Sequence, residues 1–164
     1  MNNKTVEKEY EDMLSKACML INRRFGTDFT PDKLIIRYFT SDNGVEKYNE
    51  IKELFPPETD YDNEIFQSEE YYNEIFARAL ISDDHDGLLI RTDLDFSEDE
   101  VIFSLTHELA HCFCTRNEIE SGHFFEEYCL GEYSEENGYI NVGYAIWRET
   151  IADVIAFEAF SHLM

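Results

Sequence analysis

The spacing of apolar residues predicts an amphipathic helix near each end of the chain. From Glu7 to Arg24 the apolar residues recur three and four positions apart, which is the spacing of a helix with one buried face. Gly26 follows this segment as a helix stop signal. The same periodicity appears in AIWRETIADVIAFEAF, so we expect a final helix over Tyr144–Met164.

Two short apolar runs predict strands, and the segments between them predict helices. Leu34–Phe39 and Gly87–Thr92 are rich in leucine and isoleucine and lie beside turn-forming residues. A helix is expected over Val45–Phe55, where two prolines stop it, and further helix over Tyr61–Ile81. The residues of the latter segment expected to face the core are Ile65, Phe66, Tyr72, Ile75, Phe76, Ala79 and Leu80.

A capping box marks the start of another helix. Ser97 is followed three residues later by Glu100, which places a helix start near Glu98 and a run to about Thr115. Residues 117–138 hold seven glutamates and no basic residue, and they are expected to form a long, partly irregular connecting segment. Together the elements indicate an α+β fold that is mostly helical, with a small sheet.

The charge distribution excludes several functional classes. A chain of 164 residues has the length of a single domain. It contains 36 acidic and 13 basic residues, for a net charge of −23. The first 52 residues carry nine of each sign, so the whole excess lies in the remainder. Such a surface repels phosphate backbones and anionic lipid headgroups, so we expect no nucleic-acid partner and no membrane partner. The 15% aromatic content supplies a core that charged disordered chains lack.

Targeting signals and cysteine usage favour a cytoplasmic protein. The first residues lack the plan of a secretion signal, and no apolar run approaches the roughly 20 residues that span a bilayer. The four cysteines show no regular spacing. Cys112 and Cys114 are two positions apart on the capped helix and point roughly 200° from one another, so they do not ligate one ion and are expected in the core.

The sequence HELAH, residues 107–111, lies in the middle of the capped helix. His107 and His111 are four positions apart and share one helix face, so both imidazoles can reach one metal ion. Glu108 lies beside them and is placed to hold a water molecule rather than the metal. The flanks of this segment are apolar, and titratable side chains in such surroundings need partners, which a metal ion supplies.

A third ligand is expected from the last helix. Glu149 and Asp153 are four positions apart in apolar surroundings, where a cation would offset the cost of the two carboxylates. Two alternatives for Glu149 are pairing with Arg148 and simple exposure to water. A further alternative for the third ligand is His123, in SGHFFEEY. The metzincin pattern fails, because Cys114 and Asn117 occupy the positions of its glycine and histidine.

HELAH followed by Glu149-x-x-Ala152-Asp153 resembles the gluzincin metallopeptidases, the group of zincins that includes thermolysin-like enzymes. The resemblance covers residues 98–162 and implies one zinc ion per chain, bound by His107, His111 and Glu149. It implies that Glu108 is the general base and that Asp153 orients His107 through a hydrogen bond.

The resemblance also implies a zincin-like fold with the sheet next to the active-site helix. We expect one metallopeptidase domain over residues 1–164, with residues 1–60 as scaffold and residues 87–164 as the metal-site portion. The strand Leu88–Thr92 would be the sheet edge on which an extended peptide is added, with Arg91 near the substrate.

The expected function is zinc-dependent hydrolysis of peptide bonds by a metal-activated water, with Glu108 as general base. Candidate transition-state donors are Tyr139, Tyr144 and His123. The substrate would be a peptide or protein, with a preference for basic ones because of the negative field. Two alternatives share these residues: a non-catalytic or regulatory zinc-binding module that uses the helix pair to recognise a partner, and a hydrolase of non-peptide amides.

Overall fold

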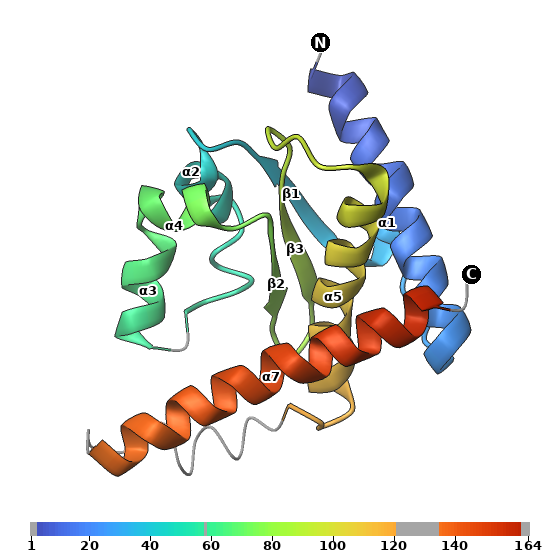
Figure 1. The fold of residues 1–164 in the computed structure, drawn as a ribbon. Helices are drawn as coiled ribbons and strands as arrows, with labels where there is room; N and C mark the ends of the chain where they lie inside the picture. Colours follow the sequence, from blue (N-terminus) through green and yellow to red (C-terminus); the bar gives the residue numbers. More distant parts are fainter. Residues whose placement is uncertain (1–2, 58, 121–134, 162–164) are drawn as a thin grey trace.

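The protein folds around a three-stranded sheet in a computed structural model that describes residues 3–57, 59–120 and 135–161 (Figure 1). The strand order is β1-β3-β2. β1 (Ile35–Phe39) runs parallel to β3 (Asp86–Arg91), and β2 (Ala77–Ile81) runs antiparallel to it. The two predicted strands are confirmed, and so is the expectation of an α+β fold that is mostly helical with a small sheet.

The strand expected at the sheet edge is in fact the central one, so that prediction was wrong. Leu88 of β3 lies between Ile36 of β1 and Ala79 of β2. The edge strand next to the HELAH helix is β2, which belongs to a segment predicted to be helical. The apolar run 88–90 of β3 is buried on both faces, as expected of a strand with neighbours on either side.

One face of the sheet is covered by α1 (Asn3–Phe25) and α5 (Glu98–Arg116). These two helices share a core with alternate residues of the sheet. The core includes Leu14, Ala17 and Ile21 of α1, Leu105 and Leu109 of α5, and Ala77, Leu88 and Ile90 of the sheet. Gly26 has a φ of 70° and ends α1, as the sequence predicts. The helix predicted from Glu7 to Arg24 is confirmed, and the structure extends it at both ends.

The opposite face carries three short helices, α2 (Gly44–Asn49), α3 (Asp60–Phe66) and α4 (Glu69–Glu74). A second core, rich in aromatic rings, joins them to the sheet and contains Phe39, Tyr48, Ile51, Phe55, Phe66, Tyr72, Leu80 and Leu89. The helix predicted to reach Phe55 ends at Asn49. The continuous helix predicted over 61–81 is wrong, because the segment divides into α3, α4 and β2.

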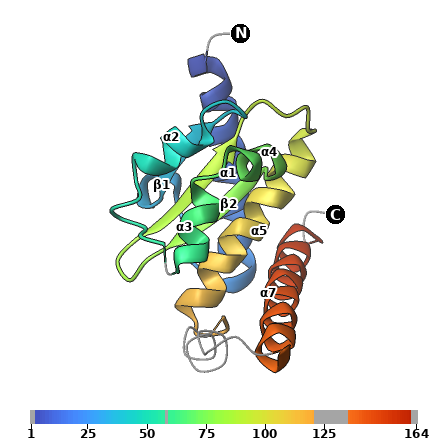
Figure 2. The ribbon, with the colours of Figure 1, turned by 90° about the vertical axis from the view of Figure 1, so that its left-hand side faces the viewer.

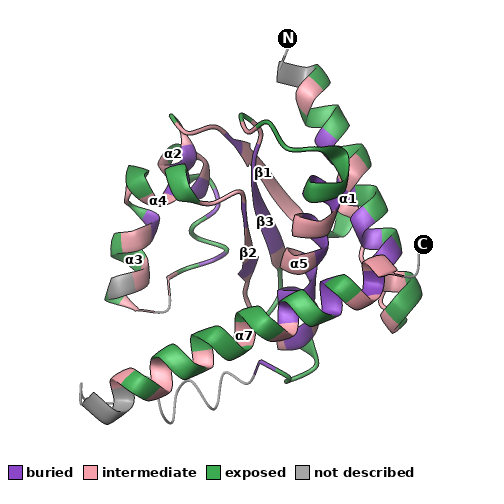
Figure 3. Ribbon diagram, viewed as in Figure 1, coloured by how far each residue is buried: buried purple, intermediate pink, exposed green. Residues whose placement is uncertain are grey.

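The last helix, α7 (Glu135–Ser161), crosses α5 and also contacts α1 (Figures 1 and 2). Ala152, Ile155 and Ala159 are buried in the core shared by α1 and α5. The helix starts nine residues before the predicted Tyr144, so the end of the expected irregular connecting segment is helical. The outward side of α7 is largely exposed (Figure 3). Among the described residues, no helix is long and apolar enough to cross a membrane.

Candidate metal centre

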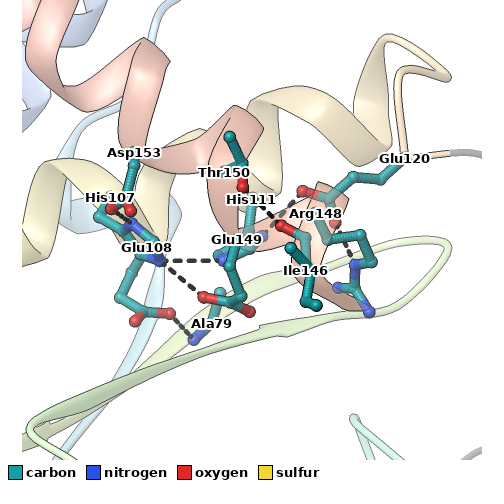
Figure 4. A network of polar contacts seen from close by, with 10 residues as sticks. All are labelled: Ala79, His107, Glu108, His111, Glu120, Ile146, Arg148, Glu149, Thr150 and Asp153. Atoms are coloured by element: carbon teal, nitrogen blue, oxygen red, sulfur yellow. Dashed lines mark hydrogen bonds and ion pairs between the residues drawn. The ribbon is translucent and has the colours of Figure 1, made fainter. Parts of the chain in front are cut away.

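The helix α5 begins at the predicted capping box. The Ser97 hydroxyl accepts a hydrogen bond from the Glu100 amide, and the Glu100 carboxylate accepts one from the Ser97 amide at 2.9 Å. The packing of α5 against α7 determines which residues of α5 face that helix. His107 and His111 lie one turn apart on that face, with ring centroids 4.8 Å apart (Figure 4).

Three potential metal-ligand atoms converge between α5 and α7. The Nε2 atoms of His107 and His111 are 3.1 Å apart. Glu149 places Oε2 3.2 Å from Nε2 of His107 and Oε1 3.7 Å from Nε2 of His111. The structure therefore brings together the two histidines and the glutamate that the sequence predicts as ligands, and these three residues could hold a metal ion.

The distances and the chemistry of this donor set fit a zinc ion. Tetrahedral zinc with bonds of about 2.0–2.1 Å separates its ligand atoms by roughly 3.3–3.4 Å. Nε2 of His107 lies 3.1 Å from Nε2 of His111 and 3.2 Å from Oε2 of Glu149, both close to this value, while the other Glu149 oxygen, Oε1, lies 3.7 Å from Nε2 of His111. Two imidazole nitrogens and one carboxylate oxygen also form a ligand set that catalytic zinc sites use.

Each histidine is oriented by a carboxylate on its other ring nitrogen. Asp153, one turn after Glu149 on α7, lies with Oδ1 2.8 Å from Nδ1 of His107. Glu120 lies with Oε1 2.8 Å from Nδ1 of His111. A carboxylate at Nδ1 holds the proton on that nitrogen and leaves the Nε2 lone pair for a metal ion.

Glu120 is the residue of this centre that the sequence does not single out. It follows the end of α5, and its amide donates to the Cys114 carbonyl at 3.2 Å, which folds the chain back against the helix. Its side chain is only 2% exposed. The second oxygen, Oε2, accepts a hydrogen bond of 2.8 Å from Nε of Arg148.

The pairing of Arg148 bears on one of the alternatives for Glu149. Arg148 binds Glu120 and lies over the Tyr144 ring at 5.8 Å, whereas Glu149, the next residue, turns to the histidines. Successive residues on a helix point about 100° apart, which explains the different partners. The expected alternative of a pair between Arg148 and Glu149 is therefore wrong.

Without a metal ion, the histidines and carboxylates stabilise one another's charged forms. Burial lowers the pKa of His111, but hydrogen bonds with Glu120 and Glu149 outweigh it and raise that pKa to about 9. The pKa of His107 is also raised, because hydrogen bonds with Glu149 and Asp153 outweigh its burial. The histidines in turn hold the pKa of Glu149 well below its ordinary value. A cation bound between them would take over the role of the protons.

Glu108 is anchored to the sheet edge beside the three ligand atoms. Its Oε2 accepts a hydrogen bond of 2.6 Å from the amide of Ala79 in β2 (Figure 4). The Phe76 carbonyl accepts from the Arg91 amide, so the main-chain groups of residues 76, 78 and 80 point toward β3. The amide of Ala79 consequently points away from the sheet, where Glu108 binds it.

Comparisons with family models, with curated proteins and with solved structures find no match to this chain.

The other predicted residues are not among the three potential ligands found in the described part of the protein. Tyr139 lies on the first part of α7 with 72% of its surface exposed, and Tyr144 stacks on Trp147 with ring centroids 5.9 Å apart. His123 lies outside the described residues. Cys112 and Cys114 are buried in the core, as predicted.

Arg91 was expected near the substrate on an edge strand, with an exposed strand arginine as the alternative, and the structure matches neither the edge position nor the exposure. Arg91 lies in the central strand, is buried, and pairs with Asp93. Its guanidinium also donates to the carbonyls of Tyr72 and Asn73. This arginine joins the end of β3 to α4.

Proposed function

We propose that the chain is a zinc-dependent metallopeptidase of the gluzincin type, with His107, His111 and Glu149 as zinc ligands. The observation that carries this proposal is the position of Glu108. It lies on the same helix as the two histidines, yet its carboxylate is bound to the edge of β2 rather than to the ligand atoms. A site that only binds metal has no need of such a carboxylate.

The roles of the protein side chains follow from these contacts. A bound zinc ion would polarise the substrate carbonyl and lower the pKa of a coordinated water molecule. Glu108 would accept the proton of the attacking water and return it to the leaving nitrogen. The Ala79 amide restrains one oxygen of Glu108, and Asp153 and Glu120 keep the imidazoles in the orientation that presents Nε2.

The edge of β2 that has no partner strand among the described residues supports a peptide as the substrate. Main-chain groups at positions 77, 79 and 81 point away from β3, and all of them except the Ala79 amide, which binds Glu108, are placed to hydrogen-bond an extended chain. This edge lies beside Glu108, because Ala79 itself binds that carboxylate. A small non-peptide amide would have no use for a strand edge at this position.

The overall charge supports a preference for basic substrates. Of the net charge of −23, all lies after residue 52, in the part of the chain that supplies β2, α5 and α7. The field of such a surface raises the local concentration of cations and of positively charged peptides. This preference would weaken with added salt.

A second candidate function is supported by exposed apolar residues on α7. Val142, Ile146, Val154 and Phe157 are each more than half exposed, on the helix that also carries Glu149. Such residues are typical of a surface that binds a partner. A regulatory module that uses the zinc-bearing helix pair for recognition would retain zinc but would not depend on Glu108.

Metal analysis and a Glu108→Gln variant test the proposal. We expect about one zinc per chain, and the variant should retain the zinc while losing hydrolysis of a mixed peptide library. Glu53→Gln, at an exposed position far along the chain from the ligands, is the matched control and should keep both. Absence of zinc from purified and from zinc-reconstituted protein, or equal turnover by Glu108→Gln, would refute the proposal.

A further inference from the structure

Arg78 lies on the edge strand directly before the residue that anchors Glu108. It is paired with Leu89 across the sheet, and Ala79 follows it. Side chains alternate along a strand, so Arg78 shares a face with Leu80, which belongs to the core of Tyr48, Phe66 and Tyr72. Arg78 therefore leaves the edge strand on the α4 side of the sheet, opposite the side covered by α5.

The guanidinium of Arg78 has no anionic partner in the described part of the protein. Its Nε is buried and makes no hydrogen bond. The other described lysines and arginines that are shielded from solvent each pair with a carboxylate: Arg37 and Lys47 with Glu50, Arg91 with Asp93, and Arg148 with Glu120. The chain has 36 acidic residues, yet none of those described pairs with the sheltered Arg78. The Arg78 guanidinium therefore still requires an anion.

The charges around Arg78 connect it to the proposed active site. Burial lowers the pKa of Arg78, but its interactions with the Tyr71 side chain and with the carboxylates of Glu108, Glu149 and Asp62 outweigh this effect and keep the group charged. Tyr71 belongs to α4, and its ring packs at 5.9 Å from the Phe66 ring. The guanidinium thus lies between α4 and the sheet edge, within the field of both the general base and a zinc ligand.

We propose that Arg78 binds a carboxylate of the substrate, either an acidic side chain or the C-terminal carboxylate of a peptide laid along β2. This inference rests on the proposed peptidase function and names a substrate class for it. An arginine presents a planar fork of donors that matches a carboxylate. Because Arg78 points to the α4 side and the histidines lie on α5, it receives a substituent of the peptide rather than the carbonyl that reacts.

A carboxylate at this position is compatible with the acidic surface. The field of the distant carboxylates is screened over about 8–10 Å at 0.1–0.15 M salt, whereas a direct pair with a sheltered arginine is screened much less. High salt therefore suppresses the general preference for basic peptides. The local preference for a carboxylate remains and can be measured separately.

Three peptides test the inference: acetyl-tetra-alanine with a free C-terminal carboxylate, the same peptide as its C-terminal amide, and the amide with one alanine replaced by aspartate. Binding is measured by calorimetry in 0.5 M NaCl on the full chain in the zinc-loaded Glu108→Gln background, so that no peptide is consumed. We expect at least one carboxylate peptide to bind ten-fold or more tightly than the neutral amide. Which peptide it is identifies the source of the carboxylate.

Substitutions of Arg78 decide whether this residue causes the preference. Arg78→Gln should bring the three affinities within two-fold of one another, and Arg78→Lys should retain part of the difference because it keeps the charge without the fork. Arg23→Gln removes a positive charge from the exposed surface of α1 and should retain the full preference. If Arg78→Gln fails to fold by circular dichroism, Arg78→Lys carries the comparison.

Several outcomes would overturn the inference: equal binding of the three peptides, no binding of any, or a preference that persists in both Arg78 variants. A uniform fall in kcat for every peptide, with unchanged ratios of KM, would also overturn it by assigning Arg78 to the transition state. Hydrolysis of the neutral amide, lost in Glu108→Gln, tests the peptidase proposal separately. A chain that cleaves this peptide without any carboxylate preference retains the proposed function and refutes the role of Arg78.

Discussion

Replacing Glu120 by glutamine tests whether the buried carboxylate maintains the metal centre. Glu120 uses one oxygen for Nδ1 of His111 and the other for Nε of Arg148, each at 2.8 Å. Glutamine has the same shape but offers one acceptor oxygen and one NH₂ group. Whichever way the amide is turned, its NH₂ group faces one of the two donors. The substitution therefore removes one hydrogen bond and the negative charge without opening a cavity.

The magnitude follows from the burial of this carboxylate. A hydrogen bond to a charged group contributes roughly 1.5–3 kcal/mol. Loss of a carboxylate that orients a ligating histidine lowers metal affinity about 10–100-fold, or about 1.4–2.7 kcal/mol. Because the Glu120 side chain is 2% exposed, water does not replace the lost contact, and we expect the upper part of this range. The Asp153 side chain is 63% exposed, so Asp153→Asn should cost no more than about ten-fold.

Zinc affinity is measured by competition with a chromophoric chelator at pH 7, and urea unfolding of the zinc-free variants separates metal binding from fold stability. The expected order of affinity is wild type, then Asp153→Asn, then Glu120→Gln. A Glu120→Gln affinity within two-fold of the wild type, or a larger loss in Asp153→Asn, would show that burial of the carboxylate does not set the strength of the site.

Three further predictions concern the sheet edge, acid stability and zinc binding. Ala79→Pro removes the amide that binds Glu108 but no hydrogen bond to β3, so kcat should fall about ten-fold while the zinc content stays constant. Ile81→Pro is the control: the amide of Ile81 also points away from β3, and this variant should keep its activity. Burial raises the pKa of Asp93, but hydrogen bonds from Arg91 and Ser41 outweigh it and lower it from 3.8 to about 2. This stabilisation is complete above about pH 4 and is lost as the pH falls through 2, so urea unfolding of Asp93→Asn at pH 7 should show a loss of about 1–2 kcal/mol that disappears at pH 2. With the pKa of His111 at about 9, zinc displaces one proton from this residue at neutral pH, so chelator competition should show affinity rising about nine-fold from pH 7 to pH 8.

The local features of the fold were predictable from the sequence because short-range interactions decide them. The capping box at Ser97 and Glu100 fixes the start of α5, and the helix period determines which of its residues share a face. That is why His107 and His111 were expected on one face of the helix before any tertiary contact was known. The long amphipathic spacing of α1 and the glycine after it were equally decisive.

The strand β2 was not predictable, because its conformation depends on a distant partner. In ARALI, residues 77–81, Ala77 and Ala79 face the core under α1 and α5, and Leu80 faces the aromatic core on the other side of the sheet. Alanines give little hydrophobic signal, so neither the two-residue period of a strand nor the 3.6-residue period of a helix stands out in this segment. Pairing with β3 selects the extended conformation. Whether a strand is central or at the edge depends on topology, which is why the run 88–92 was assigned to the wrong place in the sheet.

Glu120 was not predictable for a related reason. It is one of seven glutamates between residues 117 and 138, and nothing in that stretch distinguishes it. Its partner His111 is nine residues away, at a spacing that no helix or strand brings together. The contact depends on how the chain turns after α5, where Glu118 has a φ of 56° and the amide of Glu120 returns to the Cys114 carbonyl.

Each part of the proposed centre is held by a contact that does not involve the metal ion. Glu120 and Asp153 hold the two imidazoles, the Ala79 amide holds Glu108, and the burial of Ala152 in the shared core fixes the part of α7 that carries Glu149. These contacts come from separate stretches of chain, which the apolar core and the turn after α5 bring together. A zinc ion would therefore bind to an arrangement that the fold has already formed, which favours catalysis because ligand geometry and base position are set before substrate arrives.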